Sequence, residues 1–428
     1  MTSDRRSFLK QASLLLGSLA LHKSLDAALP PQIYQPFAGT TIPDVTKDED
    51  FWANIRLAYA CSPTLINLNN GGVCPAPRIT QDALDNYNRM CNEMPSYYMW
   101  RILDQGREPL RESLAALADC SPEEIAINRN ATEALNTIIL GLNLSSKDEV
   151  VLGKFDYPNM INAWKQREKR EGIKLVWAEL ELPCENDDTL VEAYTSLFTE
   201  KTKVVYLTHL INWTGQILPV RKIADEAHKR GIEVIVDGAH SFALLAYKIE
   251  DLGADYFGTS LHKWLCGPFG SGMLYIKKEK IKNIWALVSN DKPDGEDIRK
   301  FESLGTRSFP IEMAIGYSLD FHNLIGTERK QKRMHYLKTY WAEKALEIEG
   351  VKLNTSLKPK YSCAIAHVEM EGLTHTDLVN KLFADYKIHA VGIEKEYIKG
   401  VRITPNVYTT LQELDKLVGA LQKIAAKR

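Results

Sequence analysis

The stretch EVIVDGAH (233–240) is a short run of Val and Ile that ends in an aspartate, a glycine and a histidine. Three similar apolar runs precede it: EVVLG (149–153), KLVWAEL (174–180) and KVVYLTHL (203–210). Segments with helical periodicity, such as IADEAHKRG (223–231), separate the runs. Strands that are apolar throughout and connected by helices indicate a parallel sheet covered on both faces. The sequence therefore predicts an α/β fold.

The pattern of apolar and charged residues changes along the chain. After about Phe301 a charged amphipathic helical pattern (325–350) appears, followed by alternating strand and helix patterns up to Arg428. A Pro-rich polar stretch near the N-terminus has the composition of a linker. We therefore expect a signal segment (1–29), an N-terminal linker or arm (30–60), a large domain (61–300) and a smaller α+β C-terminal domain (301–428).

Composition excludes several classes of function. The formal net charge of the 428 residues is −2, and no Lys/Arg stripe stands out, so nucleic acid is not an expected partner. The seven cysteines are scattered, with no C-x-x-C pair and no His/Cys cluster at ligand spacing. We therefore expect neither a disulfide framework nor a metal site.

The N-terminal stretch DRRSFLKQASLLLGSLAL (4–21) places two arginines before a short apolar run and resembles a bacterial twin-arginine export signal. Asp4 stands where Ser or Thr is usual, and no clean A-x-A cleavage site follows. We expect recognition by the twin-arginine machinery and a periplasmic or exported protein; a basic amphipathic helix on a cytoplasmic protein is the alternative. No later run reaches the roughly 18 apolar residues of a membrane span, so we expect no membrane insertion of the mature protein.

Two ionisable residues indicate the chemistry. Asp237 closes an apolar strand, at the end where open α/β sheets bind their ligands. Lys263 follows the strand-like run ADYFGTS (254–260) and precedes three glycines in TSLHKWLCGPFGSG (259–272). An aspartate to hold a pyridinium nitrogen and a lysine to form a Schiff base are the pair that pyridoxal phosphate requires. Taken alone, Asp237 fits a cap of the next turn equally well.

A helix predicted to begin near Ala131 is a candidate binding site for the cofactor phosphate. Asn130 is a good N-cap, Glu133 stands three residues later as in a capping box, and the strand-like EIAI (124–127) precedes them. Unpaired backbone N–H groups at such a helix start attract an anion. A well-capped helix with no ligand is the alternative.

Eight motifs in order resemble the class V aminotransferase family of fold type I pyridoxal-phosphate enzymes. They cover nearly the whole chain beyond the leader: NLNNGG (67–72), NATEALN (130–136), FDYPNM (155–160), INWTGQILPV (211–220), VDGAHS (236–241), TSLHKWLCGP (259–268), ESLGTRS (302–308) and GVRITPNVYTT (400–410). The resemblance is greatest to the branch that contains isopenicillin N epimerase, with cysteine desulfurases more distant. It implies a mostly parallel sheet in the large domain and a smaller α+β C-terminal domain.

The resemblance also implies roles for the residues around the cofactor ring. Lys263 would form the Schiff base, and Asp237 would keep the ring nitrogen protonated. Tyr157 would stack on the ring, and Asn212 and His240 would donate hydrogen bonds to its phenolic oxygen. A core tyrosine and a satisfied interior histidine are the alternatives for Tyr157 and His240.

Further roles concern the phosphate, the substrate and the partner. The resemblance places the phosphate on Ala131, Thr132, Ser260 and His262. Thr306 would reach the phosphate of a neighbouring subunit, which implies a homodimer. Arg402 would bind the α-carboxylate of a small amino-acid substrate, where its planar fork suits bidentate pairing. A surface position at a strand edge is the alternative for Arg402.

The residues leave the reaction open among racemisation, transamination and β-elimination. We expect an epimerase or aminotransferase acting at the α-carbon; a C–S lyase and a non-catalytic protein that keeps the fold are the alternatives. The resemblance disfavours desulfuration, because relatives that abstract sulfur carry a cysteine nucleophile on a loop shortly before the carboxylate-binding arginine. No cysteine lies between Asp377 and Arg402 in this chain, and Cys363 lies well upstream. A nicotinamide dehydrogenase is not expected, since GPFGSG (267–272) leads into the strand MLYI and not into a helix.

Overall fold

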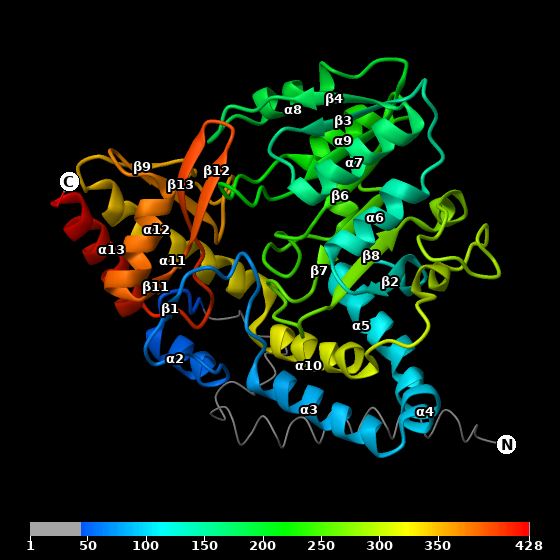
Figure 1. The fold of residues 1–428 in the computed structure, drawn as a ribbon, viewed down its shortest axis with the longest axis horizontal. Helices are drawn as coiled ribbons and strands as arrows, with labels where there is room; N and C mark the ends of the chain where they lie inside the picture. Colours follow the sequence, from blue (N-terminus) through cyan, green and yellow to red (C-terminus); the bar gives the residue numbers. More distant parts are fainter. Residues whose placement is uncertain (1–43, 428) are drawn as a thin grey trace.

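The computed structural model describes residues 44–427. The twin-arginine-like stretch, for which an export role was expected, lies outside these residues. A seven-stranded sheet forms the centre of the larger part of the molecule, in the order β2-β8-β7-β6-β5-β3-β4 (Figure 1). Its strands are β2 (Ile125–Asn128), β3 (Glu149–Gly153), β4 (Lys174–Ala178), β5 (Thr202–Thr208), β6 (Glu233–Asp237), β7 (Tyr256–Ser260) and β8 (Gly272–Ile276).

The sheet is mostly parallel, as predicted. Strands β3 to β7 pair in parallel, and β8 runs antiparallel to both β7 and β2. The four apolar runs that predicted the fold form β3, β4, β5 and β6. The α/β fold class is therefore confirmed.

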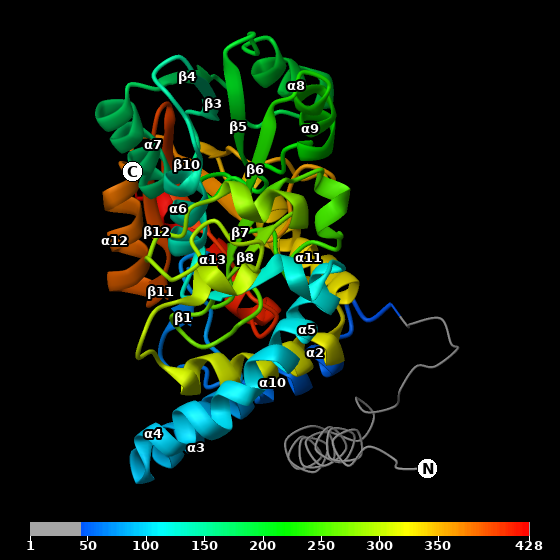
Figure 2. The same ribbon diagram turned by 90° about the vertical axis from the view of Figure 1, so that its right-hand side faces the viewer.

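Helices cover both faces of this sheet because successive strand residues point to opposite sides. On β6, Ile235 packs with the core under α6 and α7, whereas Val234 and Val236 pack with the core under α8 and α9. Figure 2 shows the two helix pairs on opposite sides of the strands. The helices of these layers are α5 (Arg107–Ala118), α6 (Ala131–Gly141), α7 (Pro158–Glu171), α8 (Asp187–Thr195) and α9 (Val220–His228).

A second, four-stranded antiparallel sheet lies in the C-terminal part, in the order β12-β13-β10-β9. Its strands are β9 (Val351–Leu353), β10 (Ala366–Met370), β12 (Val391–Lys395) and β13 (Ile398–Ile403), and the neighbouring helices are α11 (Thr327–Leu346), α12 (His375–Tyr386) and α13 (Leu411–Ala425). The N-terminal elements α2 (Glu49–Leu57) and β1 (Ile66–Asn67) join this part, where β1 pairs with β11 (Ile388–His389). Trp52 and Leu68 thus share a core with Met334 and Leu417. The domain boundary near residue 300 stays a prediction.

The remaining elements are helices that lie around the large sheet or lead from it to the C-terminal part. Helix α10 packs along α3, where Thr80 Oγ1 lies 2.9 Å from Ser318 Oγ, and the pair forms the lower edge of Figure 1. These elements are α3 (Arg78–Glu93), α4 (Pro95–Tyr97), the π-helix η2 (Tyr98–Ile102), α10 (Phe309–Ile325) and the 3₁₀ helices η3 (Leu103–Gly106), η4 (Pro122–Glu124), η5 (Ile249–Leu252), η6 (Lys278–Asn283) and η7 (Ile298–Glu302). Within residues 44–427, no helix is long and apolar enough to cross a bilayer.

Candidate active site

A pocket of about 370 Å³ lies where β5, β6 and β7 end, between the two sheets. Thr208, Asp237 and Ser260 are the last residues of these strands, and all three line the pocket. The pocket also contains eight further side chains that the sequence singled out. These are Ala131, Thr132, Tyr157, Asn212, His240, His262, Lys263 and Arg402. The fold thus brings together ten of the eleven predicted site residues, and Thr306 is the one that does not line this pocket.

Lys263 carries the amine at the centre of the pocket. Its Nζ donates a hydrogen bond to Nε2 of His240 at 2.9 Å. Burial lowers the pKa of Lys263 to about 8, although the nearby carboxylate of Asp237 acts in the opposite direction. A considerable fraction of this amine is therefore neutral and nucleophilic near neutral pH.

Asp237 supplies the buried negative charge. Its carboxylate accepts hydrogen bonds from the Tyr206 hydroxyl at 3.0 Å and from the Ala239 N–H at 2.9 Å. Burial raises the pKa of Asp237 because two neutral donors do not replace its full hydration. A cation placed against this carboxylate would be stabilised, and a protonated pyridine nitrogen is such a cation.

The start of α6 forms the polar end of the pocket. Asn130 caps the helix by accepting the Glu133 N–H at 2.9 Å, as predicted, and Ser260 Oγ accepts the Ala131 N–H at 2.9 Å. The carboxylate of Glu133 bonds the Arg129 N–H at 2.7 Å, one residue before the group that a capping box requires. The reason is that the Arg129 guanidinium binds the same carboxylate.

Glycine and histidine complete this end of the pocket. A Cβ at Gly272 would lie 2.5 Å from the Asn130 backbone, so only glycine allows β8 to approach the helix start this closely. His262 donates from Nδ1 to the Ser271 carbonyl at 3.0 Å, and burial lowers the pKa of its ring, so the neutral ring presents Nε2 to the pocket as an acceptor. The Ser260 hydroxyl and the backbone N–H groups at the start of α6 are donors that suit a phosphate group.

Arg402 enters the pocket from β13 in the other sheet. Its Nη1 donates to the Asn212 carbonyl and its Nη2 to Asn69 Oδ1, both at 3.0 Å. Burial lowers the pKa of Arg402 to about 10. No carboxylate of the described chain lies within ion-pair distance of this guanidinium, and its Nε has no hydrogen-bond partner there. A ligand carboxylate would therefore stabilise this buried guanidinium, which has no anionic partner among the described residues.

Tyr157 and Thr306 occupy different surroundings. Tyr157 precedes α7 and is 39% exposed at the pocket, so it is not a core tyrosine. Thr306 is exposed and lines another cavity, together with Asn128 and Arg307, and does not line this pocket. Its contact with a neighbouring subunit stays a prediction.

Several contributors to the site were missed from the sequence. Asn69 binds Arg402 across 333 positions of chain, and Tyr206 binds Asp237 from the neighbouring strand. The motif NLNNGG contained a signal for Asn69, because it is one of the eight ordered motifs. Tyr206 lies within the apolar run KVVYLTHL (203–210), so nothing in the local sequence indicated that its hydroxyl would contact Asp237.

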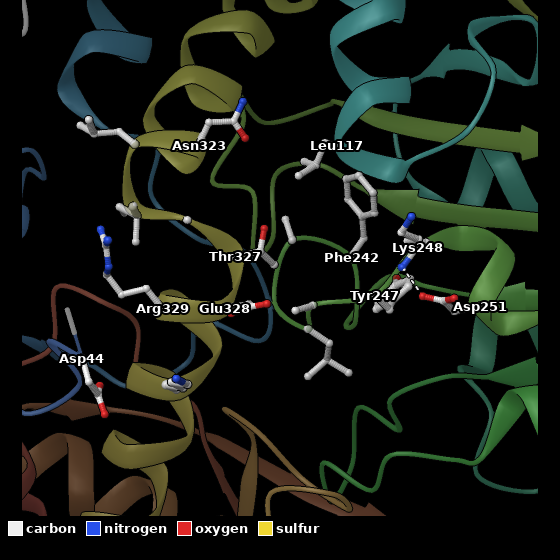
Figure 3. Close-up of a pocket in the computed structure, with 17 residues that line it drawn as sticks. Asp44, Leu117, Phe242, Tyr247, Lys248, Asp251, Asn323, Thr327, Glu328 and Arg329 are labelled. Atoms are coloured by element: carbon white, nitrogen blue, oxygen red, sulfur yellow. Dashed lines mark hydrogen bonds between the residues drawn. The ribbon is translucent and has the colours of Figure 1, made fainter. Parts of the chain in front are cut away.

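Another cavity, of about 620 Å³, lies beside the turn between α10 and α11 (Figure 3). Charged side chains such as Asp44, Lys248 and Arg329 surround it, and Asp251 accepts a hydrogen bond from the Lys248 N–H at 2.9 Å. None of the residues singled out from the sequence lines this cavity, so the Lys263 pocket is the candidate active site.

Residues 76–416 match the family described as Aminotransferase class-V, which is most of the chain. The chain belongs to the class V aminotransferase family. Among curated relatives, isopenicillin N epimerase from Streptomyces clavuligerus is 27% identical over 394 residues, covering 88% of this chain and 99% of that protein. A probable cysteine desulfurase from Halalkalibacterium halodurans is 28% identical over 385 residues, covering 84% and 93%.

Solved structures share the class V fold. A complex between the cystine C-S lyase C-DES and its reaction product cysteine persulfide superposes with a TM-score of 0.76 at 22% identity, covering 84% of this chain and 98% of that one. The Escherichia coli cysteine desulfurase CsdA gives a TM-score of 0.78 at 20% identity, covering 88% and 98%. Fold type I is therefore confirmed.

The prediction that disfavoured desulfuration is wrong. The probable cysteine desulfurase from Halalkalibacterium halodurans matches this class V chain with about the same identity and coverage as the epimerase does, and further cysteine desulfurases match it as well. Loss of a β-sulfur depends on a stabilised carbanion at Cα, and the groups for that are present in the pocket. The lack of a cysteine between Asp377 and Arg402 therefore does not argue against C–S chemistry.

The cofactor of this class V enzyme is pyridoxal phosphate, and the pocket fits it. Neutral His240 accepts from Lys263 through Nε2, so its Nδ1 carries the proton and has no acceptor among the described residues. Asn212 also lines the pocket, and its side-chain Nδ2 is the atom that can donate to a phenolic oxygen. The Nδ1–H of His240, the carboxylate of Asp237 and the donors at the start of α6 match the phenolic oxygen, ring nitrogen and phosphate of the cofactor.

Proposed function

We propose that this class V enzyme acts at the α-carbon of an amino acid or a peptide-like amine, as an epimerase or an aminotransferase. The observation that carries the proposal is the meeting of Lys263, Asp237 and Arg402 in one buried pocket. Likeness to the isopenicillin N epimerases along nearly their whole length supports an epimerase.

Each residue has a distinct task in this reaction. Arg402 binds the substrate carboxylate with its buried guanidinium, and Asn69 and Asn212 hold that guanidinium in place. When bound, pyridoxal phosphate supplies an electron sink that stabilises negative charge at Cα. Lys263 moves the proton at Cα, because its depressed pKa makes the amine both a base and an acid near neutral pH. His240, 2.9 Å from the amine, positions it.

A C–S lyase is the second candidate. The cysteine desulfurase relatives support it, and it would use the same pocket. Here the Lys263 amine would again remove the Cα proton, and the sulfur on Cβ would be the leaving group.

The test is an absorption spectrum of the purified protein followed by borohydride treatment and peptide mapping. We expect a near-visible band, and a pyridoxyl label on Lys263 that is absent from the Lys263→Ala variant. A label elsewhere, or none, would refute the assignment. Products then separate the reactions: inverted stereochemistry indicates an epimerase, a keto acid an aminotransferase, and sulfide or persulfide a C–S lyase.

We also propose a homodimer in which Thr306 approaches the phosphate bound by the partner subunit. The exposed position of Thr306 outside its own pocket supports this arrangement. We expect light scattering to give twice the chain mass, and Thr306→Val to weaken cofactor retention. A monomer that retains the cofactor fully would contradict the proposal.

Export to the periplasm by the twin-arginine machinery is a further proposal, supported by Arg5 and Arg6 before the short apolar run. Replacement of both arginines by lysine should leave the protein in the cytoplasmic fraction. Fractionation of bacteria that express the two forms measures this. An unchanged distribution would favour the cytoplasmic alternative.

A further inference from the structure

The titratable side chains that line the pocket all have tasks already. Asp237 faces the ring nitrogen, Lys263 and His240 serve the reacting centre, His262 serves the phosphate, and Arg402 binds the carboxylate. No other Asp, Glu, Lys, Arg or His among the described residues lines the pocket. Within a single chain, a charged substrate side chain would therefore find no partner among the described residues of the pocket.

The wall next to Arg402 is apolar. Val391 on β12 lies directly opposite Arg402 on β13, so both side chains project from the same face of the sheet. Ile393 lies two residues further along β12 and shares that face. Both residues line the pocket.

Val391 forms the surface of this wall that a ligand can reach, because it is half-buried, and Ile393 lies behind it, 5% exposed in the core that it shares with Phe155. Trp213 adjoins Asn212, whose carbonyl binds Arg402, and its indole N–H already donates to the Phe155 carbonyl at 2.9 Å. The Trp213 ring therefore offers the pocket only carbon surface.

The next cation along this face of β12 does not change the character of the wall. Lys395 continues along the same face of β12, but it does not line the pocket. Its ammonium lies 3.3 Å from the carboxylate of Glu396. A short acidic side chain held beside Val391 would thus lose its hydration without gaining a partner.

We propose that the substrate side chain is apolar, and that Val391 and Ile393 determine this preference. The inference rests on the proposed function, because it takes the substrate carboxylate to lie on Arg402. Burial of an aliphatic side chain against this wall stabilises the complex in proportion to the apolar area covered. A thiol or thioether side chain satisfies the same condition.

The test uses the holoenzyme and three amino acids of similar shape. L-Leucine, L-asparagine and L-aspartate are titrated while the near-visible cofactor band is followed, which gives an apparent Kd for each without requiring turnover. We expect leucine to bind at least about tenfold more tightly than either polar analogue.

Two variants locate the effect. Val391→Thr keeps the shape of the side chain and replaces one methyl group by a hydroxyl, so it should weaken leucine binding and narrow the difference in Kd between leucine and asparagine. Val176→Thr is the matched control, since Val176 lies half-buried on β4 and does not line the pocket. Its three constants should equal those of the parent enzyme.

The outcomes separate the two proposals. Tighter binding of aspartate or asparagine than of leucine overturns the apolar preference but leaves the proposed function standing, because the band still moves. An unchanged leucine constant in Val391→Thr overturns the role of this wall. A band that moves with no amino acid overturns the proposed function together with this inference.

Discussion

The depressed pKa of Lys263 makes a quantitative prediction for cofactor loading. Only a neutral amine attacks the aldehyde, and the pKa of about 8 compares with an ordinary lysine value of 10.5. At pH 7 the neutral fraction is then about 9%, against roughly 0.03% for an ordinary lysine. Between pH 6 and 7.5 the rate of reconstitution of the apoenzyme should rise nearly tenfold per pH unit, and it should level off above about pH 8.

The assay is stopped-flow absorbance of apoenzyme mixed with pyridoxal phosphate, with N-acetyl-lysine as the control that corrects for protonation of the aldehyde itself. Two variants test the cause. Arg402→Leu removes a positive charge that lowers the Lys263 pKa, so the midpoint should move to higher pH. Asp237→Asn removes a negative charge that raises it, so the midpoint should move to lower pH. A midpoint near 10.5, or shifts of both variants in the same direction, would refute the reasoning.

Three further predictions concern individual contacts. Arg402→Leu should raise the apparent Kd of the amino-acid substrate about tenfold to a hundredfold in spectral titrations, because charged hydrogen bonds to the carboxylate are lost. Ser260→Ala leaves the Ala131 N–H without its 2.9 Å acceptor, so cofactor dissociation measured by dialysis should become several-fold faster. Asp156 is buried and its pKa is raised to about 7, so the folded state favours its neutral form. The stability that the neutral form confers is fully present below the unfolded pKa near 3.8 and is lost as the pH rises through 7. The Asp156→Asn variant stays neutral at every pH. Its free energy of unfolding in urea should therefore exceed that of the parent by up to a few kcal/mol at pH 8, and should not exceed it at pH 4.

The sequence predicted the parallel core because each of its strands is locally recognisable. Runs such as EVVLG and EVIVDGAH contain the full apolar signal of β3 and β6 within a few residues. The reversed direction of β8 was not predicted, because a strand reads the same in either direction. The pairing of β1 with β11 joins segments more than 300 positions apart, which no local pattern encodes.

The site divides in the same way. Asp237, Lys263 and Asn130 were identifiable because each stands at the end of a local element whose geometry follows from its own neighbours. The contact of Arg402 with Asn212 arises only when the two sheets come together, and the contact with Asn69 arises only when the N-terminal segment pairs beside β13, where Asn69 lies opposite Thr404. Glu133 shows a local rule that was overridden, since the guanidinium of Arg129 drew its carboxylate away from the expected cap.

The placement of Arg402 has a consequence for how the two halves of the molecule move. Its side chain starts on β13 of one sheet and donates a hydrogen bond to the main chain beside the other sheet. It therefore links the two halves of the molecule and also offers a cation to the ligand. Any rocking of one half against the other must carry the anion-binding group with it. A substitution of Arg402 would thus change both the binding of the substrate carboxylate and the contact that limits movement between the two halves.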